Sequence, residues 1–81
     1  MDNPDHQSFN NAQIRSLLID LKKAIRKLTP YFPDHIDQLT NVYLLNHEMC
    51  MSYCGEQRAI DELLKHIAGL RAYKKALTAK K

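Results

Sequence analysis

The sequence has little of what builds turns and strands. Its 81 residues include two glycines, three prolines and no tryptophan. Few residues are β-branched, so strands are poorly supported. So little glycine leaves no material for a loop that cradles phosphates, and no paired carboxylates or catalytic triad stand out. We therefore expect an all-α protein that is not an enzyme.

Long apolar runs are missing as well. No stretch of about 18 apolar residues occurs, so we expect no segment that spans a membrane. The N-terminal stretch MDNPDHQSFNN has neither the basic region nor the apolar region of a secretory signal. We expect a cytoplasmic protein, where the two cysteines stay reduced and no disulfide staples the fold.

Positive charge is missing from the middle of the chain. The formal net charge is +3, yet residues 29–57 contain no lysine or arginine, whereas residues 10–28 and 58–81 are basic. A uniform polyanion-binding protein would carry bases throughout. An acidic middle between two basic ends instead favours antiparallel packing, either within one chain or across a dimer.

What the sequence does contain is helical periodicity. Apolar residues recur at helical spacing in three segments, which predict helices at about 10–28, 33–54 and 57–78. Asn10 is a good helix-capping residue, which places the first helix start there. Gly55 favours a break between the second and third helices, because glycine is common just past a helix end.

The predicted helices form a single domain over residues 10–78. We expect a small three-helix bundle or a long helical hairpin, with a disordered polar tail at 1–9 and a frayed basic end at 79–81. A chain of this size buries only a little over about 60% of the surface that its unfolded form exposes. Such small domains often need a partner subunit, so we expect self-association.

The second helix is the expected dimer interface. Its apolar residues lie on most sides, and a helix of this kind is usually buried on most of its circumference. We predict a homodimer that pairs through this helix. The predicted interface residues are Val42, Leu45, Met49 and Tyr53.

The stretch HEMCMSYC within the second helix admits several interpretations. We favour cysteines that fill the core, since unpaired cysteine behaves as a small apolar side chain. The alternatives are a metal or redox site that uses His47, Cys50 and Cys54, which would make the chain a metal-responsive regulator, or a catalytic cysteine. The outer two of these residues lie about 10 Å apart along the helix, too far to share one tetrahedral ion. We therefore expect no cofactor.

Two further surfaces are candidates for binding partners. On the first helix Arg15, Lys22 and Arg26 line up on one side, with Ile19 among them. We interpret this side as the docking face of an adaptor or an inhibitor-type regulator for a larger protein.

The basic C-terminus offers an alternative function, which is nucleic-acid binding by a dimer. Arg71, Lys74 and Lys75 would contact phosphates, and Tyr73 would stack on a base. The competing interpretation is a solvated helix end, where bases suit the helix dipole.

Overall fold

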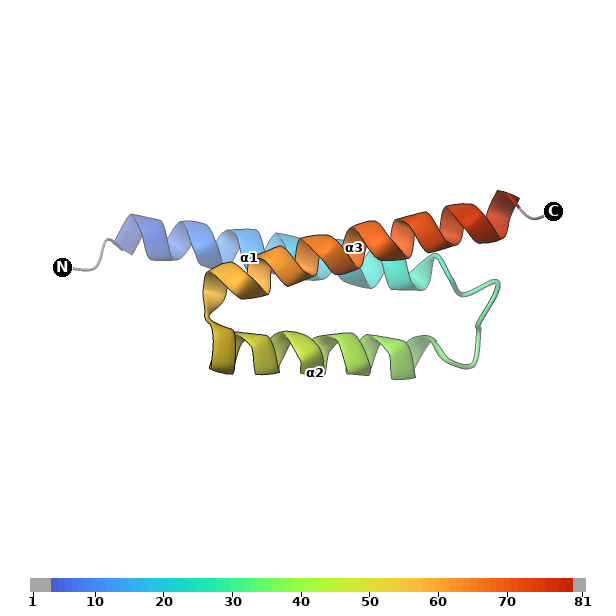
Figure 1. Ribbon diagram of the computed structural model, residues 1–81, viewed down its shortest axis with the longest axis horizontal. Helices are drawn as coiled ribbons and strands as arrows, with labels where there is room; N and C mark the ends of the chain where they lie inside the picture. Colours follow the sequence, from blue (N-terminus) through green and yellow to red (C-terminus); the bar gives the residue numbers. More distant parts are fainter. Residues whose placement is uncertain (1–3, 80–81) are drawn as a thin grey trace.

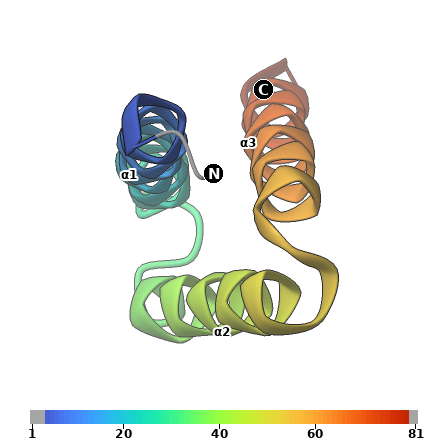
Figure 2. The same ribbon diagram turned by 90° about the vertical axis from the view of Figure 1, so that its left-hand side faces the viewer.

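A computed structural model describes residues 4–79, with side chains described from residue 11 onwards. This part of the chain forms three helices, α1 (Pro4–Arg26), α2 (Ile36–Cys54) and α3 (Glu56–Ala79). The helices α1 and α3 lie side by side and run in the same direction, while α2 runs back beneath them (Figure 1). Seen from the end, α2 crosses obliquely from below α1 to below α3 (Figure 2). The predicted all-α bundle is confirmed.

The hydrophobic core is a seam between α1 and α3. The apolar residues of each helix share one face, and the two faces bury each other. The apolar periodicity of the third helix is therefore explained by packing against α1 within one chain. The buried residues are Ile14, Leu17, Leu21, Ala24, Ile25, Leu28, Ala59, Ile60, Leu63, Ile67 and Leu70.

The helix α2 is an outer layer, and none of its residues is buried. Its inward side chains, among them Leu39, Tyr43 and Met51, only pack against the edge of the core. The expectation that this helix is buried on most of its circumference is wrong for the single chain. The reason is that α1 and α3 already cover each other's apolar faces, which leaves α2 only the rim of the seam.

The first helix starts earlier than the sequence predicted. It begins at Pro4 instead of Asn10, so residues 4–9 belong to the helix. Proline suits a first helical turn, because its fixed φ matches the helix and its missing N–H leaves no unmet donor there. At the other end Ala79 still belongs to α3, while the remaining tail residues, 1–3 and 80–81, lie outside the described residues.

The connection between α1 and α2 is anchored to the end of α3. The Tyr31 hydroxyl and the Thr78 hydroxyl are hydrogen-bonded at 3.2 Å. The Phe32 ring stacks on the Tyr73 ring, with ring centroids 6.2 Å apart and planes inclined by 9°. Turns fill this connection, so α2 begins at Ile36, slightly later than the sequence predicted.

The predicted break at Gly55 is confirmed. This glycine has φ 92° and ψ 171°, a backbone conformation that is essentially restricted to glycine. Its N–H donates to the Cys50 carbonyl at 3.1 Å, and its own carbonyl accepts from the Ala59 N–H at 3.1 Å. One residue therefore both closes α2 and opens α3, which lets the chain reverse direction.

Candidate functional site

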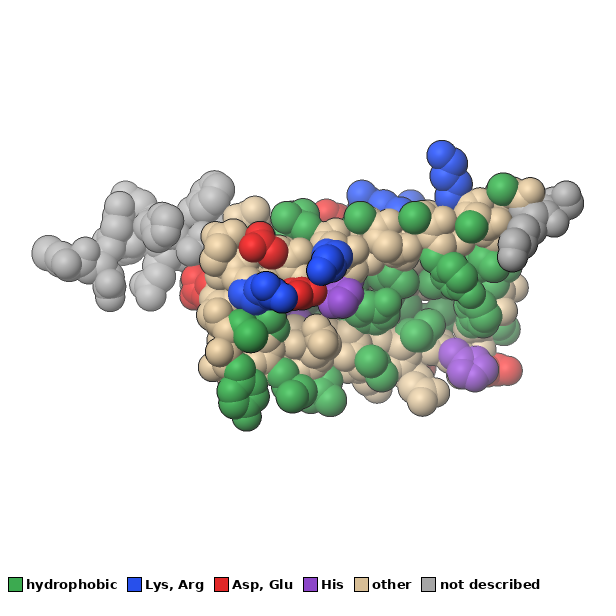
Figure 3. Space-filling view, viewed as in Figure 1, with side chains coloured by type: hydrophobic (Ala, Val, Ile, Leu, Met, Phe, Trp, Pro, Cys, Tyr) green, Lys and Arg blue, Asp and Glu red, His purple; other side chains and the backbone are tan. Residues whose placement is uncertain are grey.

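The outer face of α2 carries a row of large apolar side chains that meets solvent. Val42 and Leu45 are each 57% exposed, Met49 is 52% exposed and Tyr53 is 82% exposed. We call these four residues the α2 stripe. Their spacing of three and four places them on one side of the helix. Hydrophobic side chains gather along the lower edge of the molecule, where α2 lies (Figure 3). The structure thus brings the four predicted interface residues together on one open surface.

Within α2 itself no charged residue borders the α2 stripe, but on the side facing α3 Met49 and Tyr53 line a cleft together with Arg58 and Glu62. At about 100° per residue, the neighbours of the stripe around the helix include Gln38, Asn46 and Ser52, all uncharged. The carboxylates of the helix, on Asp37 and Glu48, project more than about 90° away from the centre of the stripe. An apolar surface bordered mainly by polar residues suits contact with another protein surface.

A shallow hollow lies at the N-terminal end of the α2 stripe. It has a volume of about 260 Å³ and is lined by His35, Gln38, Leu39 and Val42. Val42 therefore belongs to both the stripe and the hollow. The hollow was not predicted from the sequence. His35 lies in the turn before α2, and only the local backbone geometry brings its side chain to the hollow.

The predicted docking face of α1 is also assembled. Arg15, Lys22 and Arg26 are exposed, and Ile19 is 50% exposed among them. Helical spacing sets all four residues on one side, away from the seam that α1 shares with α3. This basic face, which we call the α1 face, therefore has no part in the core.

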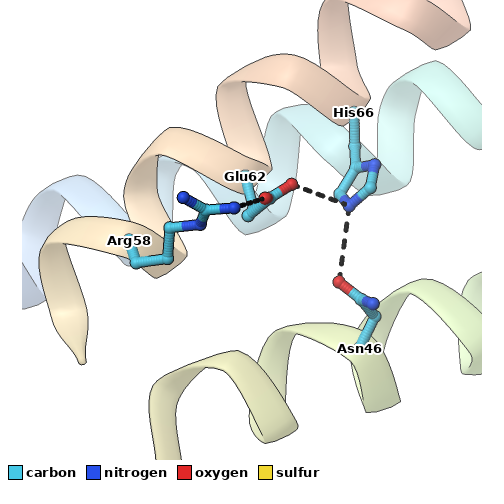
Figure 4. Close-up of polar contacts among 4 residues, drawn as sticks. All are labelled: Asn46, Arg58, Glu62 and His66. Atoms are coloured by element: carbon cyan, nitrogen blue, oxygen red, sulfur yellow. Dashed lines mark hydrogen bonds and ion pairs between the residues drawn. The ribbon is translucent and has the colours of Figure 1, made fainter. Parts of the chain in front are cut away.

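A polar network joins α2 to α3 (Figure 4). Glu62 lies 3.1 Å from the Arg58 guanidinium and 3.9 Å from Nε2 of His66. The same Nε2 is 3.4 Å from the amide oxygen of Asn46. The His66 ring packs edge-on against the Tyr43 ring, with ring centroids 5.1 Å apart. Sequence analysis missed the network, although the spacing of four between its α3 members was a usable signal. The contacts fix α2 in place across a cleft.

The two thiols line the same cleft and are not core residues. Cys50 is half-buried and Cys54 is exposed, so the prediction of core cysteines is wrong, because α2 does not enter the core. Burial raises the pKa of the Cys50 thiol, and the neighbouring Cys54 thiol raises it further. A raised pKa keeps a thiol protonated and weakly nucleophilic, which is the opposite of what a catalytic cysteine needs.

His47 does not line this cleft. Its Nδ1 is buried and has no hydrogen-bond partner among the described residues, and burial lowers the pKa of its imidazole. Among residues 4–79 there is no group of three or more His, Cys, Asp or Glu side chains placed to hold a metal ion. The alternative metal site at His47, Cys50 and Cys54 therefore has no ligand set in the part of the chain that the structure describes.

The basic residues near the C-terminus divide into two places. Arg71, Lys74 and Lys75 line a cleft of about 490 Å³ together with Lys27 from the end of α1. Tyr73 lies elsewhere, stacked on Phe32. Sequence analysis missed Lys27, since it joins the others only because α1 and α3 run parallel and end at the same side (Figure 1).

None of the described helices is long and apolar enough to cross a membrane. A comparison with known protein families, curated proteins and solved structures finds no match to this chain. The surfaces whose chemistry bears on function are the α2 stripe, the α1 face and the basic cleft, which is lined by Lys27, Arg71, Lys74 and Lys75.

Proposed function

We propose that this chain is a small cytoplasmic protein–protein interaction module, without catalytic activity, that acts as an adaptor or inhibitor-type regulator of a larger protein. The observation that supports this function is the α2 stripe, a continuous apolar row on a helix with no buried residue. Contiguous apolar patches on small proteins mark interaction surfaces. The module self-associates through this stripe and uses another surface for its larger partner.

The α1 face is the surface that we assign to the larger partner. It lies away from the core and keeps three cationic side chains around one exposed aliphatic residue, Ile19. Cations of this kind steer association with an acidic surface and fix its register, while an aliphatic residue at the centre supplies apolar contact. The larger partner therefore presents an acidic patch.

Reversing the charges of the α1 face is expected to abolish capture of the larger partner. The variant Arg15→Glu, Lys22→Glu and Arg26→Glu should reduce the captured protein at least about tenfold, because like charges then oppose the acidic partner. The measurement is an affinity pull-down from native lysate treated with nuclease, with bound proteins quantified by mass spectrometry. Exposed residues tolerate such changes, and circular dichroism checks that the helices persist.

Lys65→Glu is the matched control for this experiment. Lys65 is equally exposed but lies on α3, away from the α1 face, so this variant should capture the partner as wild type does. Full retention of binding by the triple variant would remove the α1 face from the proposal.

A second candidate function is nucleic-acid binding through the basic cleft. The observation that favours it is the cleft itself, where Lys27 joins three bases of α3 and no acidic residue is part of the lining. Bases near the C-terminal ends of two parallel helices also satisfy both helix dipoles, which is the competing structural explanation. Only the first explanation predicts an affinity for nucleic acid that depends on salt concentration.

Binding through the basic cleft should weaken steeply with salt. For duplex DNA, each neutralised phosphate contributes about 0.9 to the slope of log K against log salt, so replacing all four bases by glutamine should flatten this slope by about 3–4. Fluorescence anisotropy with a labelled duplex, between low and physiological salt, measures the slope. Lys65→Gln serves as the control and should leave the slope unchanged. An affinity for DNA that changes neither with salt concentration nor with the four substitutions would exclude this function.

A further inference from the structure

We propose that the α2 stripe is covered by α2 of a second copy running antiparallel, with Tyr53 of each copy seated in the hollow of the other copy. This inference deepens the proposed self-association and does not depend on the larger partner. It commits to one orientation, one register and one anchoring residue.

The positions along α2 are symmetric in the way that such a dimer requires. Tyr53 and Gln38 are equally far from the helix midpoint just after Leu45, and so are Val42 and Met49. A two-fold axis through this midpoint sets Val42 against Met49 of the second copy, and it places Leu45 and its counterpart on either side of the axis, about 1.5 Å apart along the helices. It also sets Tyr53 against the hollow around Gln38. A two-fold interface must be self-complementary in this sense, since the same patch serves both copies.

The hollow and the tyrosine are complementary in shape and chemistry. Tyr53 is the most exposed large residue of the stripe, at 82%, and the hollow of about 260 Å³ has room for a phenol ring. Leu39 and Val42 line it with apolar surface, while Gln38 and His35 offer polar partners for a hydroxyl. Tyrosines that fill a pocket near other apolar contacts are typical anchors of protein interfaces.

The charges near the ends of α2 favour the antiparallel orientation. Asp34 and Asp37 lie near its start, whereas the residues after its end include Glu56 and also Arg58, which is paired with Glu62. A parallel pair would place the two aspartate-rich ends side by side. An antiparallel pair keeps these ends apart and also opposes the two helix dipoles.

The area available fits a second copy that binds weakly. The stripe offers on the order of 400–500 Å² of apolar surface, near the size of the largest patch on a typical monomer. Together with the polar residues around it, the stripe approaches the low end of specific interfaces, below the roughly 800 Å² per partner of a standard one. We therefore expect a dimer that dissociates in the micromolar range, not an obligate one.

The first test is the oligomeric state of the purified full chain. Sedimentation velocity across the micromolar range should show wild type passing from monomer to dimer. Tyr53→Ala and Leu45→Glu should each raise the dissociation constant of the dimer at least about tenfold. The first variant removes the anchoring side chain, and the second places a charge beside the two-fold axis. The control is Leu64→Glu, which changes a residue 48% exposed on α3 and should dimerise normally. Wild type that stays monomeric throughout this range overturns the proposal.

The second test is the orientation. The variants Val42→Cys and Met49→Cys are made separately in a Cys50→Ser, Cys54→Ser background, with a size tag on one of them, and are mixed and oxidised. The antiparallel register predicts mainly the mixed disulfide between the two variants. Disulfides mainly within each variant indicate a parallel pair and overturn the proposal. Circular dichroism and sedimentation of the cysteine-free parent check that the background still folds and dimerises.

The outcomes also separate this inference from the proposed function. A monomeric chain that still captures a larger protein would overturn the dimer and retain the regulator, with a different protein covering the stripe. An antiparallel dimer that captures no partner would support the inference and count against the regulator.

Discussion

Leu63→Ala should lower the free energy of unfolding by about 2–5 kcal/mol, the range for truncating a fully buried leucine. Leu63 is 1% exposed and lies in the centre of the seam between α1 and α3. A protein of this length has a total stability on the order of 4–12 kcal/mol, so the substitution removes a large share of it. Urea titration followed by circular dichroism measures the loss.

The neighbouring residue supplies the control for that experiment. Leu64 is 48% exposed on the same helix, so Leu64→Ala deletes the same atoms without opening a cavity and should change stability by no more than about 0.5 kcal/mol. Equal losses from the two variants would mean that the seam between α1 and α3 is not the core.

Gly55→Ala should lower the free energy of unfolding by about 1–3 kcal/mol, entirely through backbone strain. The residue has φ 92° and ψ 171°, which side chains rarely tolerate, and a Cβ added there would meet no atom within 4 Å. The measured loss of stability therefore reflects the backbone conformation at Gly55 and not a steric clash. Chemical denaturation under the conditions used for Leu63→Ala measures it.

Gly69→Ala is the matched control, and we expect it to act in the opposite direction. Gly69 lies inside α3, and an added Cβ again meets nothing within 4 Å. Alanine in an open helical position is more favourable than glycine by about 0.5–1 kcal/mol, so this variant should be stabilised. The same change at both glycines therefore has opposite signs. Destabilisation by both, or by neither, would contradict the break at Gly55.

The features that the sequence predicted correctly are local ones. Helical periodicity was sufficient for three helices, and the chemistry of glycine was sufficient for the break at Gly55. The α2 stripe and the α1 face were also within reach, because residues on one helix share a side whatever the helix packs against. Whether either surface binds a partner stays a prediction.

The features that the sequence did not predict depend on which helices pair. An apolar pattern identifies a face but not what covers it, so the sequence could not show that α1 and α3 pair and leave α2 outside. The basic cleft was missed for the same reason, since Lys27 and Arg71 meet only when two helices far apart in the chain run parallel. The early start at Pro4 was missed because a polar composition does not by itself oppose a helix.

The parallel course of α1 and α3 sets an order in which the chain assembles. The seam between α1 and α3 cannot form until the roughly 30 residues between Arg26 and Glu56 bring the chain back to the start of α1. Closing a loop of that length costs about 3 kcal/mol of chain entropy. Contacts between α2 and α3 are closer in sequence, so we expect them to form first. Although α2 adds no buried residue, it thus acts as a connection of fixed length. It returns the chain to the start of α1, so that α3 can pack parallel to α1.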